Sequence, residues 1–141
     1  MKRLVGSSGI GEPPVEARSS FKEGRRLGPF AAVGNGLLLA PAQRHGRQLH
    51  ITSDGRPGYK ERYDEVGNFV KVGKSLHLAV ARLDGHGFHI TPDGKRAYDA
   101  EFSHVEDFEK VGSRWLATVS IGNGQTYLRW FRIDRNGKRF R

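Results

Sequence analysis

The chain has 141 residues, 36% of them hydrophobic and 28% charged, with a formal net charge of +9 at pH 7. This is the length of one ordinary domain, and the absence of cysteine excludes disulfides, thiolate metal sites and cysteine nucleophiles. The longest apolar run, residues 37–40, is far shorter than the roughly 20 residues of a membrane span. No apolar region follows the charged start, so we expect a cytoplasmic protein.

The N-terminal part of the chain differs in composition from the rest. Residues 1–20 are rich in Gly, Ser and Pro, which predicts a flexible tail. Residues 21–49 are interpreted as a degenerate N-terminal half-repeat, because residues 21–24 (Phe-Lys-Glu-Gly) are similar to the later residues 69–73 (Phe-Val-Lys-Val-Gly).

A unit of about forty residues repeats along the remaining chain. Residues 50–55 (His-Ile-Thr-Ser-Asp-Gly) return 39 residues later as 89–94 (His-Ile-Thr-Pro-Asp-Gly), and the match runs without a gap until Val80 meets Val119. A third copy begins with Arg132-Ile133 and ends at residue 141. We therefore predict a single β-repeat domain over residues 21–141, with repeats at 50–88 and 89–131 and a partial repeat at 132–141.

Turn residues predict how each unit folds. Asn-Gly or Asp-Gly pairs begin at positions 35, 54, 84, 93, 123 and 136, and such pairs supply the positive φ angles of tight hairpin turns. The sequence predicts an all-β fold of tandem antiparallel β-hairpin repeats, with irregular segments between the hairpins. The predicted strands are 76–80 and 88–91, followed in the next copy by 115–120 and 125–133.

Apolar residues that recur at equivalent repeat positions are the candidate core. Some lie three residues apart, a spacing that fits neither a helix nor a regular strand, so we expect irregular extended chain there. The predicted core is Ile51, Tyr63, Val66, Phe69, Ile90, Phe102, Val105, Phe108, Trp115 and Ile133.

Over residues 47–141 the pattern resembles WG-type β repeats. The residues that carry this resemblance are Phe88-His89-Ile90, Asp93-Gly94, Tyr98, Phe102, Val105, Phe108 and Gly112, with a similar opening at Trp130–Asp134. The resemblance implies a β-rich repeat fold, and it implies no catalytic residue.

Motifs for chemistry are weak. Val72-Gly73-Lys74-Ser75 lacks the first glycine of a phosphate-binding loop and precedes a predicted strand. His86 and His89 could approach Asp84 or Asp93 around a turn, but lone strand histidines are more often outward polar residues than zinc ligands. We predict no catalytic residue, no cofactor and no metal, and we do not expect an enzyme.

Alternation along the strands predicts a candidate binding surface, because neighbouring strand residues face opposite sides. If Ile51, Ile90 and Ile133 face the core, then His50, His89 and Arg132 face outward. Equivalent positions after the turns are basic. The full predicted surface is His50, His89, Arg132, Arg56, Lys95, Lys138, Arg135 and Arg139.

Charge distribution limits the partner class. Residues 63–112 hold 6 Lys/Arg and 9 Asp/Glu, whereas residues 113–141 hold 7 and 1. We expect a non-catalytic repeat scaffold that binds a protein or another anionic macromolecule. The alternative is a nucleic-acid-binding protein, in which terminal arginines act with Trp115, Tyr127, Trp130 and Phe131. An enzyme of unrecognised type is a third hypothesis.

The partial last copy predicts an open strand edge near Trp130–Ile133, and such edges invite pairing. We expect that strand either to self-associate with a second chain or to pair with residues 27–40.

Overall fold

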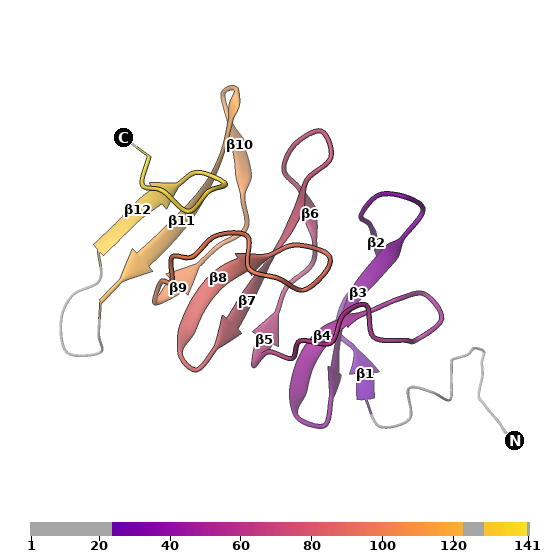
Figure 1. Cartoon of the computed structure of the whole chain (residues 1–141). Coiled ribbons are helices and arrows are strands. Elements are labelled where there is room, and N and C mark those ends of the chain that lie inside the picture. The colour runs from indigo at the N-terminus through magenta and orange to yellow at the C-terminus, as the bar shows by residue number, and fades with distance from the viewer. Residues whose placement is uncertain (1–23, 123–128, 141) are drawn as a thin grey trace, which may run out of the picture.

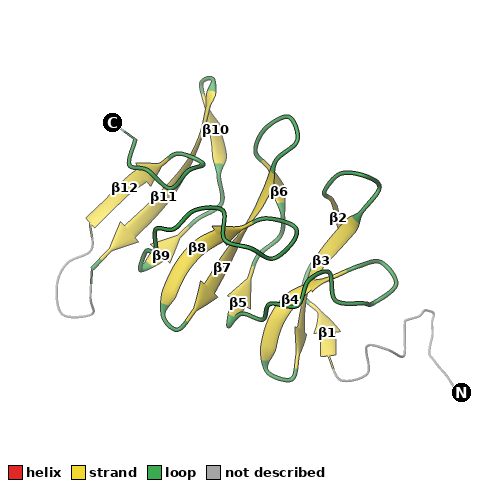
Figure 2. Cartoon of the chain, in the orientation of Figure 1, coloured by secondary structure: helices red, strands yellow, loops and turns green. Residues whose placement is uncertain are grey.

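The computed structural model describes residues 24–122 and 129–140, and every regular element in this part of the chain is a β-strand (Figure 2). The all-β prediction is confirmed. No helix that could cross a membrane occurs in these ranges. The flexible tail predicted for residues 1–20 lies outside the described residues.

Three four-stranded antiparallel sheets follow one another along the chain and lie in a row (Figure 1). The first contains β1 (Gly24–Arg26), β2 (Ala31–Ala32), β3 (Leu38–Arg44) and β4 (Arg47–Ile51). The second contains β5 (Glu65–Val66), β6 (Val70–Lys71), β7 (His77–Leu83) and β8 (His86–Ile90). The third contains β9 (His104–Val105), β10 (Glu109–Val111), β11 (Arg114–Ile121) and β12 (Arg129–Ile133).

All three sheets are built in the same way. A long central strand, β3, β7 or β11, pairs on one side with its hairpin partner β4, β8 or β12. On the other side it pairs with two short strands separated by a break. At each break one N–H still donates to the central strand, as in Gly67 N to Val80 O at 2.9 Å and Glu106 N to Thr118 O at 3.0 Å. These are the irregular segments that the sequence predicted.

The break explains the apolar spacing of three. Tyr63 precedes β5, Val66 ends it, Phe69 lies in the break and Val72 follows β6, and all four are buried. Side chains of a regular strand alternate between its two faces. The break interrupts this alternation, so residues three apart can face the same core.

Two-residue turns close the central hairpins of the first two sheets. Asp84 and Gly85 have φ angles of 54° and 84° between β7 and β8, and His45 and Gly46 have 54° and 76° between β3 and β4. These left-handed pairs match the twist of the strands they connect. The Asp84-Gly85 turn was predicted from its residue types, whereas the His45-Gly46 turn was missed because histidine is a weak turn signal.

The observed strand pairing shows that the repeats 50–88 and 89–131 do not align without a gap. Val80 lies opposite His89, and the residue opposite Arg132 is Thr118, not Val119. The β10–β11 hairpin is tighter than its counterpart, since Val111 pairs directly with Arg114. One residue is therefore lost near Gly112, and the equivalence of Val80 with Val119 is wrong.

The half-repeat alignment at the N-terminal end is also wrong. In β2, Ala31 pairs with Leu39 in the way that Val70 of β6 pairs with Leu78. Phe30, the residue before β2, is therefore the counterpart of Phe69, and not Phe21, which lies outside the described residues.

The hydrophobic core runs through all three sheets. Nine of the ten predicted core residues are buried, and Trp115 is only partly buried. The predicted pairing of the last strand with residues 27–40 is wrong, because β12 pairs with β11 and the first sheet lies at the other end of the row (Figure 1).

Adjacent sheets are joined by a reciprocal backbone pair. Gln48 N donates to Tyr63 O at 2.8 Å, and Tyr63 N donates to Gln48 O at 2.9 Å. Gly87 and Phe102 repeat this arrangement, with distances of 2.7 and 3.0 Å. The hairpin strands β4 and β8 therefore have their outer edges covered by the chain that leads into the next sheet.

Candidate binding surface

His50 and His89 do not lie on an outward surface. They are 0% and 1% exposed, so their assignment to the binding surface is wrong. His50 Nδ1 lies 2.6 Å from the Tyr59 hydroxyl and Nε2 lies 2.7 Å from Gly67 O. His89 makes the same two contacts, with the Tyr98 hydroxyl at 2.5 Å and Glu106 O at 2.9 Å.

The hydrogen-bond partners determine which nitrogen of each imidazole carries the proton. A backbone carbonyl only accepts, so Nε2 carries the proton and donates, while Nδ1 accepts from the tyrosine hydroxyl. Burial lowers the pKa of His50 and of His89 to about 4, although the carbonyl contact acts in the opposite direction. Burial also raises the pKa of Tyr59 and Tyr98. Each pair is therefore neutral and links one sheet to the next.

The third sheet lacks this buried link. Arg132 stands in β12 where His50 and His89 stand in β4 and β8, and it is exposed. The tyrosine partner lies nine residues after each histidine, and the equivalent position is residue 141, outside the described residues. A permanent cation at this position suits contact with solvent or with a charged partner.

Arg56, Lys95 and Lys138 occupy equivalent exposed positions after the three hairpins. Arg56 Nε lies 3.4 Å from Asp54, and Lys95 Nζ lies 3.1 Å from Glu61 of the preceding segment. Lys138 has no ion pair with any described residue. Of these three equivalent cations, Arg56 and Lys95 are therefore paired with carboxylates, whereas Lys138 is not paired with any described residue.

Two other candidates have structural contacts. Arg135 Nη1 donates to Val72 O at 2.9 Å, which links the third sheet to the second. The Arg139 guanidinium lies over the Phe131 ring, 4.8 Å from its centre. Arg135 and Arg139 therefore stabilise the third sheet as well as adding to its charge.

Trp130, which the nucleic-acid alternative placed with the terminal arginines, is a surface residue. It is 51% exposed and has an edge contact with His104 at 5.5 Å between ring centres. Trp130 and Arg132 are two residues apart in β12 and so share a face. Trp130 and Arg132 are therefore both available to a partner on that face.

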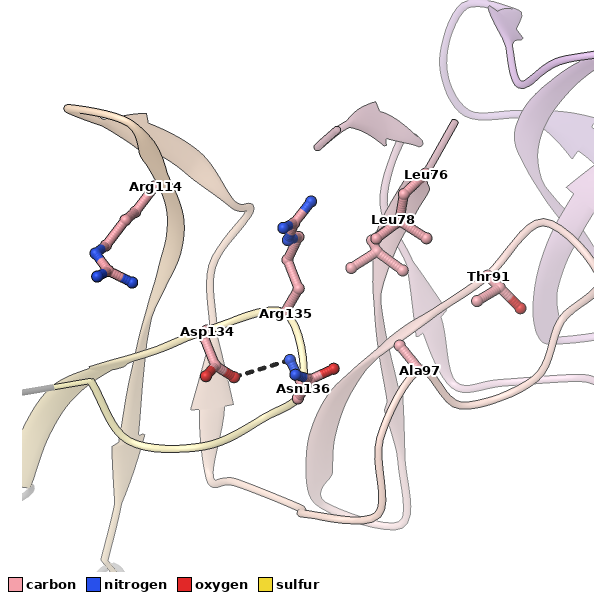
Figure 3. A pocket seen from close by; sticks show the side chains of 8 residues that line it. All are labelled: Leu76, Leu78, Thr91, Ala97, Arg114, Asp134, Arg135 and Asn136. Carbon is pink, nitrogen blue, oxygen red and sulfur yellow. Dashed lines mark hydrogen bonds between the residues drawn. The ribbon is translucent and has the colours of Figure 1, made fainter. Parts of the chain in front are cut away.

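A pocket of about 430 Å³ lies between the second and third sheets (Figure 3). Arg114 and Arg135 extend along it, and the Asp134 carboxylate accepts from Asn136 N at 2.8 Å. The remaining lining residues are Leu76, Leu78, Thr91 and Ala97. This lining contains no pair of carboxylates and no nucleophile with a base beside it, so it offers no evident reaction chemistry.

Metal chemistry has no site in the part of the chain that the structure covers, where no cluster of three or more His, Asp or Glu is placed to hold an ion. Comparison of the chain with family models, with curated proteins and with solved structures found no match. The third sheet carries three exposed cations, Arg129, Arg132 and Lys138, together with the exposed Trp130.

Proposed function

We propose that the chain is a non-catalytic scaffold of WG-type β repeats that binds an anionic macromolecule through its third sheet. The observation that carries this proposal is the group of exposed cations there. Arg129, Arg132 and Lys138 have no ion pair among the described residues, whereas Arg56 and Lys95 in the earlier sheets do. Unpaired cations on one end of a repeat array favour binding to a surface of opposite charge.

The test compares two variants with the same change in charge. Arg129→Glu, Arg132→Glu and Lys138→Glu are combined in one protein, and Lys60→Glu, Lys71→Glu and Lys74→Glu, all exposed and outside the third sheet, in a control. Binding of fluorescent polyglutamate is measured by anisotropy. The first variant should lose about tenfold or more in affinity, and the control about threefold or less, because three cations leave the binding surface only in the first. Equal losses in the two variants would contradict a localised surface.

Nucleic-acid binding is the second candidate function. The observation that favours it is Trp130, which is 51% exposed and shares a face of β12 with Arg132. Exposed aromatic rings beside cations stack on single-stranded bases. The same proteins are titrated with an oligothymidylate at several salt concentrations, and binding should weaken steeply with salt. Tighter binding to the oligothymidylate than to polyglutamate, lost in Trp130→Ala, would favour this function.

A further inference from the structure

The outer edge of β12 is only partly covered: Phe140 N donates to Arg132 O at 2.8 Å, but no described segment pairs with Trp130 on this side. Trp130 lies opposite Ser120 in the same register as Gly87 opposite Arg82. Gly87 uses its outward N–H and C=O to pair with Phe102. The N–H and C=O of Trp130 point outward in the same way, but β12 pairs only with β11 among the described strands.

The segment that covers β8 shows what such an edge accepts. Residues 98–108 (Tyr-Asp-Ala-Glu-Phe-Ser-His-Val-Glu-Asp-Phe) contain four carboxylates and no Lys or Arg. Phe102 provides the backbone pair, and Glu106 O accepts from His89. The Phe108 ring lies 4.5 Å from the His89 ring. An acidic extended segment with two aromatic residues therefore fits this edge.

Arg132 can make the contacts that His89 makes with the Glu106 carbonyl and the Phe108 ring. A guanidinium donates to backbone carbonyl oxygens and stacks on aromatic rings. It adds a permanent positive charge, and Arg129 adds another at the other end of β12. The cations of β12 thus complement the carboxylates of residues 98–108. The β12 edge is also more basic than β8, where His89 is neutral.

We propose that the outer edge of β12 binds an extended acidic segment of another protein, which adds as a short antiparallel strand. One aromatic residue of the segment pairs its backbone with Trp130, and a second, six residues later, lies over Arg132. This is strand addition at an exposed sheet edge, in which backbone hydrogen bonds give affinity and side chains give specificity. The proposal rests on the proposed function and names its partner class.

A second copy of the chain fits this edge poorly. Stacked head to tail, it would present β1, where Arg26 occupies the position of Val66 in β5. A Cβ on Gly87 would lie 3.3 Å from the Val105 side chain, so Trp130 would meet Arg26 and the cations of β1 would approach Arg132. Nucleic acid could stack on Trp130, but it has no peptide groups with which to extend the sheet.

The experiment uses the full chain and a fluorescein-labelled peptide with the sequence of residues 98–108. A second peptide carries an N-methyl group at the position of Phe102, which removes the N–H that would donate to Trp130 O. We expect N-methylation to weaken binding about tenfold, since it removes one backbone hydrogen bond and adds a clash. Arg132→Glu should weaken it by a similar factor, and the matched Lys110→Glu by about twofold or less. Circular dichroism checks that each variant is folded.

The outcomes separate this inference from the proposed function. Equal binding of the two peptides, with polyglutamate binding intact, would overturn strand addition and leave a general anionic surface. Binding of oligothymidylate with no binding of the peptide would assign the face to nucleic acid instead. Dimerisation of the wild-type chain that the peptide reverses would assign the edge to a second copy. Loss of all binding to peptide, polyglutamate and oligothymidylate would overturn both proposals.

Discussion

The ring of Tyr59 lies against the backbone of Gly94, so close that a Cβ on Gly94 would stand 2.4 Å from Tyr59 Cγ. The contact recurs between the next two units, where a Cβ on Gly137 would stand 2.6 Å from Tyr98 Cγ. Each tyrosine therefore packs on the hairpin turn of the following unit. This makes the turn glycine part of the packing between units as well as a residue of positive φ.

The glycine contact gives a prediction with an internal control. Gly94 and Gly85 have nearly the same φ, +82° and +84°, but a Cβ on Gly85 meets nothing within 4 Å. Gly85→Ala should cost about 1–2 kcal/mol from the left-handed backbone alone. Gly94→Ala should cost about 1–3 kcal/mol more from the clash with Tyr59. Urea denaturation measures both, and equal costs would contradict tight packing at Gly94.

A hydroxyl on one of two equivalent aromatic residues gives a second prediction. Tyr63 donates to Gly94 O at 2.5 Å, and its counterpart Phe102 has no hydroxyl for Gly137. Tyr63→Phe should lower the free energy of unfolding by about 1 kcal/mol, the net value of one hydrogen bond. Phe102→Tyr should raise it by up to about 1 kcal/mol if the hydroxyl reaches Gly137 O. Chemical denaturation of the two single variants tests this pair, and a stabilising Tyr63→Phe would refute it.

Core packing predicts a third contrast. Phe108 is 4% exposed and packs on His89, so Phe108→Ala should cost about 3–5 kcal/mol. Trp130 is larger but 51% exposed, and Trp130→Ala should cost less than about 1 kcal/mol. Thermal melts followed by circular dichroism distinguish the two. A melting temperature unchanged by Phe108→Ala would show that the junction between the second and third sheets carries little stability.

The buried histidines predict acid sensitivity. Burial lowers the pKa of both from 6.5 to about 4, so between these values the unfolded chain binds protons that the folded chain does not. Stability is therefore fully present above pH 6.5 and falls as the pH falls towards 4. Each histidine contributes about 3 kcal/mol to this loss.

Replacing both residues tests the origin of that slope. In His50→Gln combined with His89→Gln, the amides do not titrate, and an amide N–H can still donate to the carbonyl partner. The double variant should be less stable at pH 7 and should show a much flatter loss of unfolding free energy between pH 6.5 and 4. A wild-type stability that is constant over this range would contradict neutral buried imidazoles.

Strands and core were predictable because their signals are local. The residue types of Asp84 and Gly85 predict a turn, and Phe69 and Phe108 indicate the core because they recur at one repeat position. The face of His50 was not predictable from alternation, which assumes that one side of the strand meets solvent. Both sides of β4 are covered, and the covering group is the backbone carbonyl of Gly67, 17 residues away.

The end of the array was harder to predict for a related reason. Whether a strand residue is exposed depends on what lies beside the strand. The partial last copy indicated an open edge near Trp130–Ile133, but it did not indicate which side chains there face solvent. Trp130 is 51% exposed at a position where no described segment pairs with β12 on its outer side. Exposure at β12 is a property of position in the array and not of residue type.

The backbone pair between sheets has a consequence for how such a chain can change in length. Gln48 pairs with Tyr63, and Gly87 pairs with Phe102. Gly87 lies 39 residues after Gln48, and Phe102 lies 39 residues after Tyr63. Removing residues 64–102 would join Tyr63 to Ser103 and bring the third sheet directly against the first, with Gln48 and Tyr63 still paired. A gene of this kind can gain or lose 39 codons through unequal recombination and still encode a continuous array. A deletion of another length at the same place would change which residue lies opposite Gln48 at the junction between the two sheets.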